Sequence, residues 1–476
     1  MTAGTAAAGQ RGRAPVRVGV FGLLGSGNLG NDGSLEAVLG YLRAEHPDAV
    51  VDALCGGPEA VRARYGIPAT RLHWYRGEYR TASRAGAVAA KGVGKLVDAY
   101  RTAAWVRRHE VVIVPGMGVL EATLPLRPWG FPYALFLLSA SGRLLGTRVA
   151  LVGVGAAAIG SRPTRALVRW SARLAGYRSY RDEPSRDALR AMGVDTSRDE
   201  VYPDLAFALP TPGVDASGPG TAGPDTSGSG TLPGPAGTPS TAGPAVTADT
   251  PGTTATATAT AAKPAGAATT DTPPTAGTVC VGVMAFHGSD DDRAHADQIH
   301  QRYLTGTTRF VRALVADGRP VRLLTGDDVD RPVVEAIRTA VDSPLVTAAE
   351  TTSLAELMRE MAAADTVVAT RYHNLICALK VGTPTLALSY AAKSDTLLAQ
   401  WGLAAYCHPA RNVDADQLLH QFRELERHAT EVRQTIAERN RDAAGRLARQ
   451  FTALTTALFP ATTHAPVPTH ALREAP

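Results

Sequence analysis

Residues 365–393 read D-T-V-V-A-T-R-Y-H-N-L-I-C-A-L-K-V-G-T-P-T-L-A-L-S-Y-A-A-K, and this stretch decides the fold. Residues 366–369 form a short β-branched run that is typical of a buried parallel strand. Residues 374–380 carry apolar side chains at helical spacing ahead of a Gly-Thr-Pro turn, which indicates a helix. Residues 385–388 predict a second buried strand. A strand–helix–strand order of this kind indicates a parallel sheet covered by helices.

Polar side chains follow both predicted strands. Arg371 and His373 come after the first strand, Asn374 would cap the helix, and Lys393 comes after the second strand. Ligands of open parallel sheets bind beyond the carboxyl ends of the strands. Arg371 and Lys393 suit a carboxylate or phosphate, and His373 titrates near neutrality and can transfer a proton. Taken singly, these residues also fit surface ion pairs and a loop histidine; together they favour an anion site.

The whole chain limits the classes of function. Its 476 residues suggest two domains or more. The net charge of +5 comes from a composition in which arginine far outnumbers lysine. We find neither a run of basic and aromatic residues nor a nucleic-acid-binding module, so no nucleic-acid partner is expected.

Compartment signals favour a cytoplasmic protein. The four cysteines are widely spaced and lack a C-x-x-C pair, which predicts a reduced chain without disulfides or structural zinc. The N-terminus has no apolar core of a signal peptide. The most apolar stretch, residues 131–160, is interrupted by Arg143 and Arg148, so no transmembrane segment is predicted. Peripheral contact with a membrane remains open.

Alternating strands and helices occur in two parts of the chain, separated by a stretch rich in Ala, Thr, Pro, Gly and Ser that cannot bury a core. Each part opens with a glycine-bearing strand. We therefore predict an α/β protein with two Rossmann-like domains whose parallel sheets face across a cleft. The expected segments are a disordered tail (1–14), the first domain (15–210), a disordered linker (211–277), the second domain with closing helices (278–460) and a second disordered tail (461–476).

A glycine-rich turn follows the first predicted strand. Residues 25–30, G-S-G-N-L-G, match the dinucleotide pattern G-x-G-x-x-G, but Asp52 lies inside its strand and not at the strand end. We interpret the turn as one that brings a helix N-terminus to an anionic or sugar ligand. Asn28, Asn31 and Asp32 are then candidates for binding hydroxyl groups, although Asn31 or Asp32 would also serve as the helix cap.

Further candidates lie near the end of the first half. Arg181 emerges at a strand end, as Arg371 does in the second half, and Asp182 fits the cap of the following helix. Asp204 would either bind a substrate hydroxyl or hold Arg181. Residues 287–300 contain several histidines and aspartates, but their spacing matches no familiar metal site, so no metal is predicted.

Taken together, these motifs resemble the polysaccharide pyruvyltransferase family. The resemblance rests on six motifs in the expected order: G-N-L-G-N-D (27–32), P-G-M-G (115–118), Y-R-D-E-P-S (180–185), A-M-G-V (191–194), P-D-L-A-F (203–207) and R-Y-H…G-T-P…S-Y…K (371–393). It implies a fold similar to two-domain (GT-B-like) glycosyltransferases.

The resemblance also implies an activity. Phosphoenolpyruvate would donate a pyruvyl group to a sugar as a ketal, and the acceptor would be a cell-surface glycan or its lipid-linked or nucleotide-linked precursor. Arg181 and Arg371, with Lys393, would bind the donor, and His373 would be the general acid or base; no cofactor is expected. A nucleotide-sugar glycosyltransferase and a catalytically silent sugar- or anion-binding protein are the alternatives.

Overall fold

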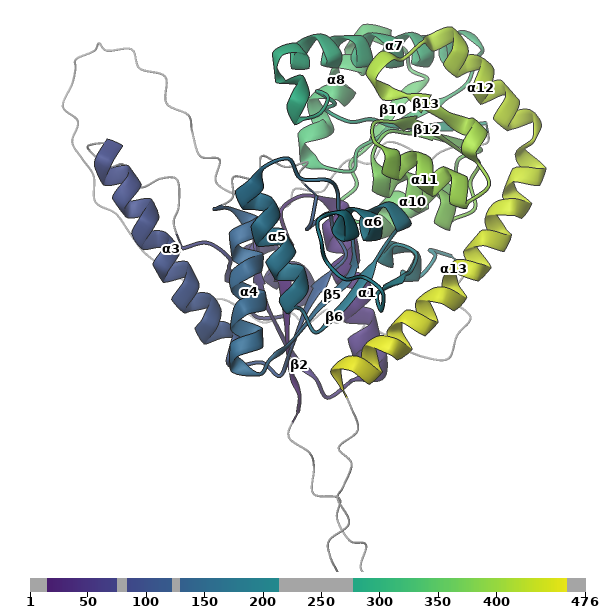
Figure 1. The fold of residues 1–476 in the computed structure, drawn as a ribbon. Coiled ribbons are helices and arrows are strands. Elements are labelled where there is room, and N and C mark those ends of the chain that lie inside the picture. Colours follow the sequence, from purple (N-terminus) through teal and green to yellow (C-terminus); the bar gives the residue numbers. More distant parts are fainter. Residues whose placement is uncertain (1–14, 75–83, 122–128, 214–276, 460–476) are drawn as a thin grey trace, which may run out of the picture.

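The computed structural model describes residues 15–74, 84–121, 129–213 and 277–459 (Figure 1). It contains two parallel sheets, one of seven strands in the order β3-β2-β1-β4-β5-β6-β7 and one of six in the order β10-β9-β8-β11-β12-β13. The predicted fold class, two parallel-sheet α/β domains, is confirmed. The predicted tails and nearly all of the predicted linker lie outside the described residues, and the domain boundaries stay a prediction.

The first sheet is covered by helices on both faces. Its strands are β1 (Arg17–Gly22), β2 (Val50–Cys55), β3 (Ala69–Arg71), β4 (Val111–Pro115), β5 (Arg148–Val154), β6 (Tyr177–Tyr180) and β7 (Glu200–Val201). Helices α3 (Arg84–Val106), α4 (Phe131–Leu145) and α5 (Arg162–Leu174) form one layer. Right-handed crossovers put α1 (Leu29–Glu45) and α2 (Pro58–Tyr65) on the other face. Helix α6 (Glu183–Ala191) and the short η1 (Leu205–Ala208) follow β6 and β7.

The second sheet has the same design. Its strands are β8 (Val279–Gly282), β9 (Val321–Leu324), β10 (Val346–Ala349), β11 (Thr366–Ala369), β12 (Thr385–Ser389) and β13 (Cys407–Pro409). Its helices are α7 (Ala296–Ala316), α8 (Arg331–Val341), α9 (Leu354–Ala362), α10 (Tyr372–Lys380), α11 (Ala392–Gln400) and α12 (Ala415–Arg427). Strands β11 and β12, which belong to residues 365–393, pair in parallel near the middle of this sheet.

Close packing in the first domain engages Asp52, the acidic residue that the dinucleotide pattern would need for a ribose contact. Gly19 in β1 has no Cβ, and the Trp105 ring occupies the space where a Cβ would lie. The Trp105 Nε1 donates a hydrogen bond of 2.7 Å to Asp52 Oδ1, and His109 Nε2 lies 3.0 Å from the same oxygen. Asp52 therefore anchors the helix layer to the sheet.

The last helix joins the two domains. The predicted closing helices are α12 and α13 (Ala429–Leu458), and the chain changes direction between them at His428. Helix α12 packs on the second domain, whereas α13 runs along both domains (Figure 1). Gln450 Nε2 donates to Ser179 Oγ at 3.0 Å, and Phe451 stacks on Tyr41 at 4.9 Å. The C-terminal part of α13, which the sequence assigned to the second domain, therefore packs on the first domain.

Candidate active site

The carboxyl ends of the two sheets meet across the domain interface. Lys393, in the first turn of α11, lies with its Nζ 3.0 Å from Glu121 Oε2 of the first domain. Asn28 Nδ2 donates to Asp327 Oδ2 at 2.9 Å. Because every strand pair in both sheets is parallel, each residue that follows a strand is delivered to this edge.

Arg181 is the buried cation of the site. It follows β6, and its side chain is only 2% exposed. Its Nη2 donates to Glu121 Oε1, and its Nη1 lies 3.8 Å from Asp204 Oδ2. The guanidinium also lies 4.7 Å from the ring centre of Tyr372, a residue of the second domain. Burial alone would lower the pKa of Arg181, but Glu121 together with Tyr372, Asp204 and Asp182 outweighs burial, and the pKa is raised.

Glu121 is the residue that our sequence analysis missed. The Glu121 carboxylate accepts hydrogen bonds from Arg181 and Lys393. Burial would raise the pKa of Glu121, but the two cations outweigh it and lower the pKa to about 2. Gly155 packs against the Glu121 and Arg181 side chains so closely that a Cβ there would overlap both. One signal was available in the sequence. Glu121 closes the glycine turn after β4, and no other acidic residue lies between Glu110 and Asp182.

His373 lies in the first turn of α10, not in the loop before the helix as predicted. Its Nε2 faces Asp204 Oδ2 at 3.9 Å, and neither atom has a hydrogen-bond partner in the described part of the chain. Burial lowers the pKa of His373 to about 4. The Asp204 carboxylate opposes this shift, and the Arg181 and Lys393 charges add to it. The imidazole is therefore neutral near pH 7 in this state.

Arg371 is close in sequence but engaged with other partners. Its Nε and Nη2 donate to Asp330 at 2.8 and 2.7 Å, and its Nη1 lies 3.8 Å from Asp327 Oδ2. Tyr390 lies on the side of Lys393, whose Nζ is 5.4 Å from the centre of the Tyr390 ring. The structure thus brings Arg181, His373 and Lys393 into one cluster and places Arg371 beside it, held by carboxylates.

Asn374 does not cap α10, which corrects the prediction. The helix begins two residues earlier than expected, at Tyr372, and Arg371 occupies the cap position. The Asn374 amide is fully buried against the strand ends at Gly282 and Gly326, where a Cβ would lie 2.6 and 2.5 Å from its atoms. Glycine at both positions makes room for the amide.

The three polar residues of the first glycine loop hold that loop in place. Asn28, and neither Asn31 nor Asp32, is the cap of α1, so the helix begins at Leu29. The Asp32 carboxylate accepts a hydrogen bond of 2.7 Å from the Gly25 amide, and Asn31 donates to a backbone carbonyl of the same loop. A role of these side chains in binding sugar hydroxyls stays a prediction. Asp182 caps α6 as predicted, by accepting from the Ser185 amide.

The comparison with protein families decides the identity. The model of the family described as polysaccharide pyruvyl transferase matches residues 28–256 and 279–391. The chain belongs to the polysaccharide pyruvyl transferase family. It is therefore a transferase, and the match includes Glu121, Arg181 and His373 of the cluster and ends two residues before Lys393. Among curated proteins, none matches the sequence.

Solved structures with the same architecture are enzymes of nucleotide-sugar chemistry. UDP-GlcNAc 2-epimerase from Neisseria meningitidis, bound to UDP-GlcNAc, has a TM-score of 0.53 at 10% identity, with 93% of this chain and 99% of that chain covered. MnaA of S. aureus with UDP has a TM-score of 0.53 at 9% identity, with 93% and 97% covered. Another UDP-N-acetylglucosamine 2-epimerase has a TM-score of 0.55 at 11% identity, with 93% and 96% covered. Such similarity shows the two-domain fold alone.

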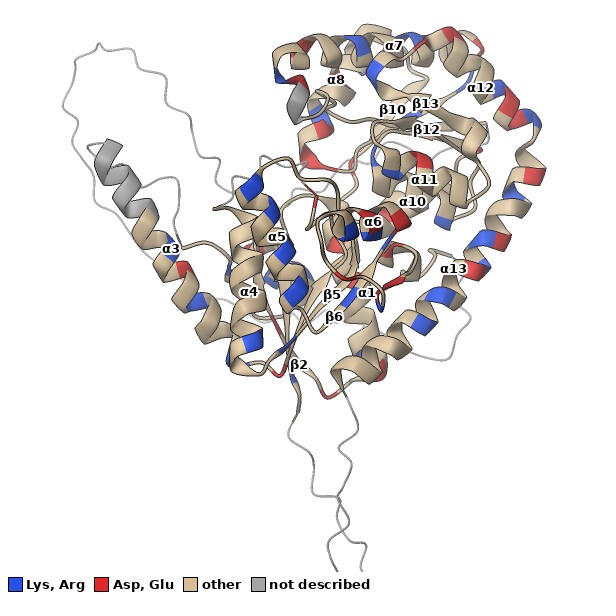
Figure 2. Ribbon diagram, in the orientation of Figure 1, with Lys and Arg blue, Asp and Glu red and all other residues tan. Residues whose placement is uncertain are grey.

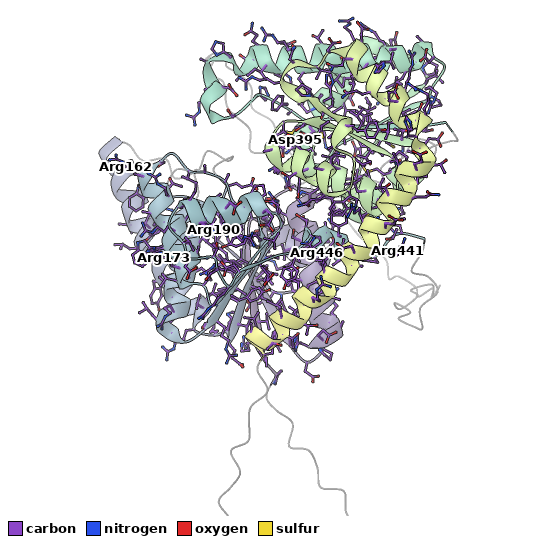
Figure 3. The ribbon with its side chains drawn as sticks, turned by 45° about the vertical axis from the view of Figure 1, so that its right-hand side comes forward. Arg162, Arg173, Arg190, Asp395, Arg441 and Arg446 are labelled. Atoms are coloured by element: carbon purple, nitrogen blue, oxygen red, sulfur yellow. The ribbon has the colours of Figure 1, made fainter. Side chains whose placement is uncertain are left out.

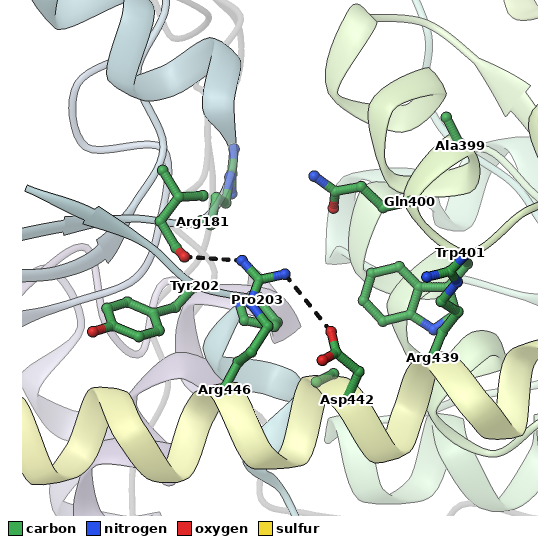
Figure 4. Close-up of a pocket in the computed structure, with 11 residues that line it drawn as sticks. Arg181, Tyr202, Pro203, Ala399, Gln400, Trp401, Arg439, Asp442 and Arg446 are labelled. Atoms are coloured by element: carbon green, nitrogen blue, oxygen red, sulfur yellow. Dashed lines mark hydrogen bonds and ion pairs between the residues drawn. The ribbon is translucent and has the colours of Figure 1, made fainter.

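In this pyruvyl transferase family member, a hollow of about 340 Å³ lies beside Arg181 at the seam between the domains (Figure 4). It is bounded by Tyr202 and Pro203 after β7, by the end of α11 and by Arg439 and Arg446 of α13. Arg446 Nη2 donates to the backbone carbonyl of Val201 at 2.9 Å. The hollow therefore lies between Arg181 and helix α13.

The histidine-rich segment of the second domain forms ring contacts. His287 stacks on His300 with ring centres 4.3 Å apart, and the side chains of Asp290 and Asp291 lie outside the described residues. Within the described ranges, no group of three or more His, Cys, Asp or Glu side chains is arranged to hold a metal ion. None of the helices described is both long enough and apolar enough to cross a membrane.

We expect Gly30→Ala to lower activity at least tenfold and to destabilise the protein by about 1–3 kcal/mol. A Cβ at Gly30 would overlap the His373 ring, so the first turn of α1 and the imidazole could not both keep their positions. Gly40→Ala in the same helix is the matched control, because Gly40 is exposed with open space around it. That variant should be more stable by about 0.5–1 kcal/mol and fully active. Urea unfolding and turnover of both variants check the prediction; equal behaviour would contradict it.

Proposed function

We propose that this transferase moves a pyruvyl group from phosphoenolpyruvate to a sugar as a ketal and releases phosphate. One observation carries the proposal: Arg181 and Lys393, from different domains, converge on a single carboxylate, Glu121, beside His373. Two fixed cations around one carboxylate form a site for a small, dense anion that bears a carboxylate of its own. Membership of the family agrees with this donor.

In the proposed complex, the donor carboxylate or phosphate takes the place of Glu121 on Arg181 and Lys393. The phosphoenolpyruvate trianion carries more negative charge than the side chain that it replaces. Arg371 would contribute from the adjacent position after releasing part of its contact with Asp330. The side chains of Lys393 and Arg371 are each 19% exposed, so a donor from solvent can reach them. The Arg181 side chain is 2% exposed and is less accessible.

The trianion also prepares the proton donor. Negative charge near an imidazole raises its pKa, so donor binding would move the pKa of His373 from about 4 towards neutrality. The imidazolium then transfers a proton to the methylene carbon of phosphoenolpyruvate, which leaves an oxocarbenium-like centre at the neighbouring carbon. One sugar hydroxyl attacks that carbon and gives its proton to neutral His373. A second hydroxyl then displaces the phosphate and closes the ketal, with its proton leaving on phosphate.

Asp204 would support the imidazolium in this scheme. Its Oδ1 is held by the amide of Ala206, and its Oδ2 points between His373 and Arg181 without a hydrogen bond within the described residues. A carboxylate 3.9 Å from Nε2 stabilises the protonated ring. The sequence left open whether Asp204 binds a hydroxyl or holds Arg181, and its position favours contact with both the cation and the imidazole.

Donor identity can be tested with the intact protein. Saturating phosphoenolpyruvate should raise the melting temperature, because a ligand at 100 times its Kd adds about 2.7 kcal/mol of stability, whereas UDP-GlcNAc should not. Phosphate release should then require a glycan acceptor. A shift with UDP-GlcNAc alone would instead indicate a nucleotide-sugar transferase. A shift with phosphoenolpyruvate but no phosphate release with any extracted surface glycan would indicate a silent binding protein.

A further inference from the structure

Exposed apolar side chains gather on one helix layer of the first domain. In the described ranges, most of the large hydrophobic side chains that face solvent belong to α3, α4, α5 or the turn that precedes α4: Val93, Leu96, Tyr100, Trp129, Leu144, Leu145 and Trp170. Leu144 is 84% exposed and Tyr100 is 76% exposed. Monomeric soluble proteins seldom leave such a group uncovered, so this surface, which we call the α3–α5 face, points to a partner.

The apolar residues of α3 form a stripe along the helix. Val93, Leu96 and Tyr100 recur at helical spacing and therefore lie on one side of it. The other side faces the domain, because Asp98 and Trp105 are buried. A surface helix normally turns its apolar stripe inward. Here a second stripe faces outward, on a helix that projects from the body of the domain (Figure 1).

The charge of the same face is wholly basic. Every charged residue between Glu121 and Asp182 is an arginine, including those spaced along α5 (Figure 2). Arg162 and Arg173 lie near the two ends of that helix (Figure 3), and Arg143 precedes the exposed leucines of α4. The one acidic residue in the sequences of α3, α4 and α5 is Asp98, which is buried and paired with Lys95.

We propose that the α3–α5 face docks on the surface of an anionic phospholipid membrane. Arginines beside exposed leucine and aromatic side chains combine the two attractions that hold a protein at a bilayer surface, which are contact with lipid phosphates and insertion of apolar groups. Trp129, Trp170 and Tyr100 suit the boundary between headgroups and acyl chains. A second copy of the chain fits poorly, because a two-fold interface would bring arginines against arginines.

The position of the face gives the docking a use. Helix α4 begins at the sheet edge that carries Glu121, so the start of this layer, with Trp129, lies at the active-site end of the domain, whereas Leu144 and Leu145 lie at the far end of α4. If pyruvyl transfer is the reaction, a lipid-linked sugar would reach the site from the bilayer to which the protein is bound. That last step rests on the proposed function, whereas the docking rests on the α3–α5 face alone.

The test uses the full-length protein and sedimentation with vesicles. We expect binding to vesicles of phosphatidylglycerol mixed with phosphatidylcholine, weaker binding at high salt, and little binding to pure phosphatidylcholine. The variant R143E/R162E/R165E should lower partitioning at least about tenfold. The control R302E/R309E/R441E makes the same change in net charge on exposed arginines elsewhere and should bind like the parent. Leu96→Ser/Leu144→Ser should also weaken binding, because both leucines lie at the surface and their loss leaves the core intact.

Four outcomes would overturn the proposal: no binding to anionic vesicles, equal binding to neutral ones, equal loss in the control variant, or concentration-dependent self-association that the α3–α5 substitutions abolish. Phosphate release with a soluble acceptor is measured separately in the same variants and should be unchanged. Loss of vesicle binding with normal turnover, or the reverse, therefore distinguishes failure of the docking proposal from failure of the proposed function.

Discussion

Arg181→Gln should lower the free energy of unfolding by about 3–5 kcal/mol and abolish the stabilisation by phosphoenolpyruvate. The large cost follows from what remains after the substitution. Glu121 loses the guanidinium and keeps Lys393, and Asp204 loses its neighbouring guanidinium in a buried setting. An unpaired buried carboxylate costs far more than the ion pair gains. Urea unfolding and thermal shift with the donor measure the two effects.

Two further variants make this result specific. Arg181→Gln/Glu121→Gln should recover part of the lost stability, because it removes one of the two buried carboxylates that lose the Arg181 charge, but it should not recover donor binding. Arg178→Gln is the control on the same strand, since it breaks the ion pair with Asp199 and leaves Glu121 untouched. It should be destabilised yet retain the donor-induced shift. A single Arg181→Gln variant within about 1 kcal/mol of the parent would show that the buried charges are not coupled as described.

His373→Gln should lower kcat for phosphate release by roughly 10²–10⁴-fold while the shift in melting temperature with phosphoenolpyruvate persists. In the proposed mechanism the imidazole gives a proton to the methylene carbon and takes one from a sugar hydroxyl, whereas Arg181 and Lys393 hold the donor. His420→Gln, on the exposed surface of α12, is the control and should behave like the parent. Near-normal turnover in His373→Gln would remove this residue from the mechanism.

The same variant should alter the dependence of stability on pH. The pKa of His373 is about 4 in the folded protein against a usual value of 6.5, so the unfolded chain binds the proton more readily. The free energy of unfolding should therefore fall as the pH falls from about 6.5 to 4, by roughly 3 kcal/mol from this residue. His46 acts in the same direction, and the difference between the parent and His373→Gln isolates the contribution of His373. Parallel curves would contradict the lowered pKa.

Local patterns in the sequence determined the fold class and the edge at which the site lies. Short apolar runs, helical spacing and glycine or proline stops predict strands and helices, and a parallel sheet delivers every residue after a strand to one edge. Arg181, His373 and Lys393 could be chosen for this reason without coordinates. The motif order also pointed to the family, which the match over residues 28–256 and 279–391 confirms.

Pairing across the domain interface was decided only by the tertiary structure. Glu121 meets Lys393 from the other domain, Gly30 packs on His373, and Arg371 turns to Asp330, which follows a different strand. Each of these contacts joins residues that are distant in the sequence. The first two depend on how the two sheets approach, whereas Arg371 and Asp330 follow strands of the same sheet. Sequence periodicity specifies the sheet edge that a side chain reaches. The partner of a charged side chain depends on distance and burial, which only the folded structure defines.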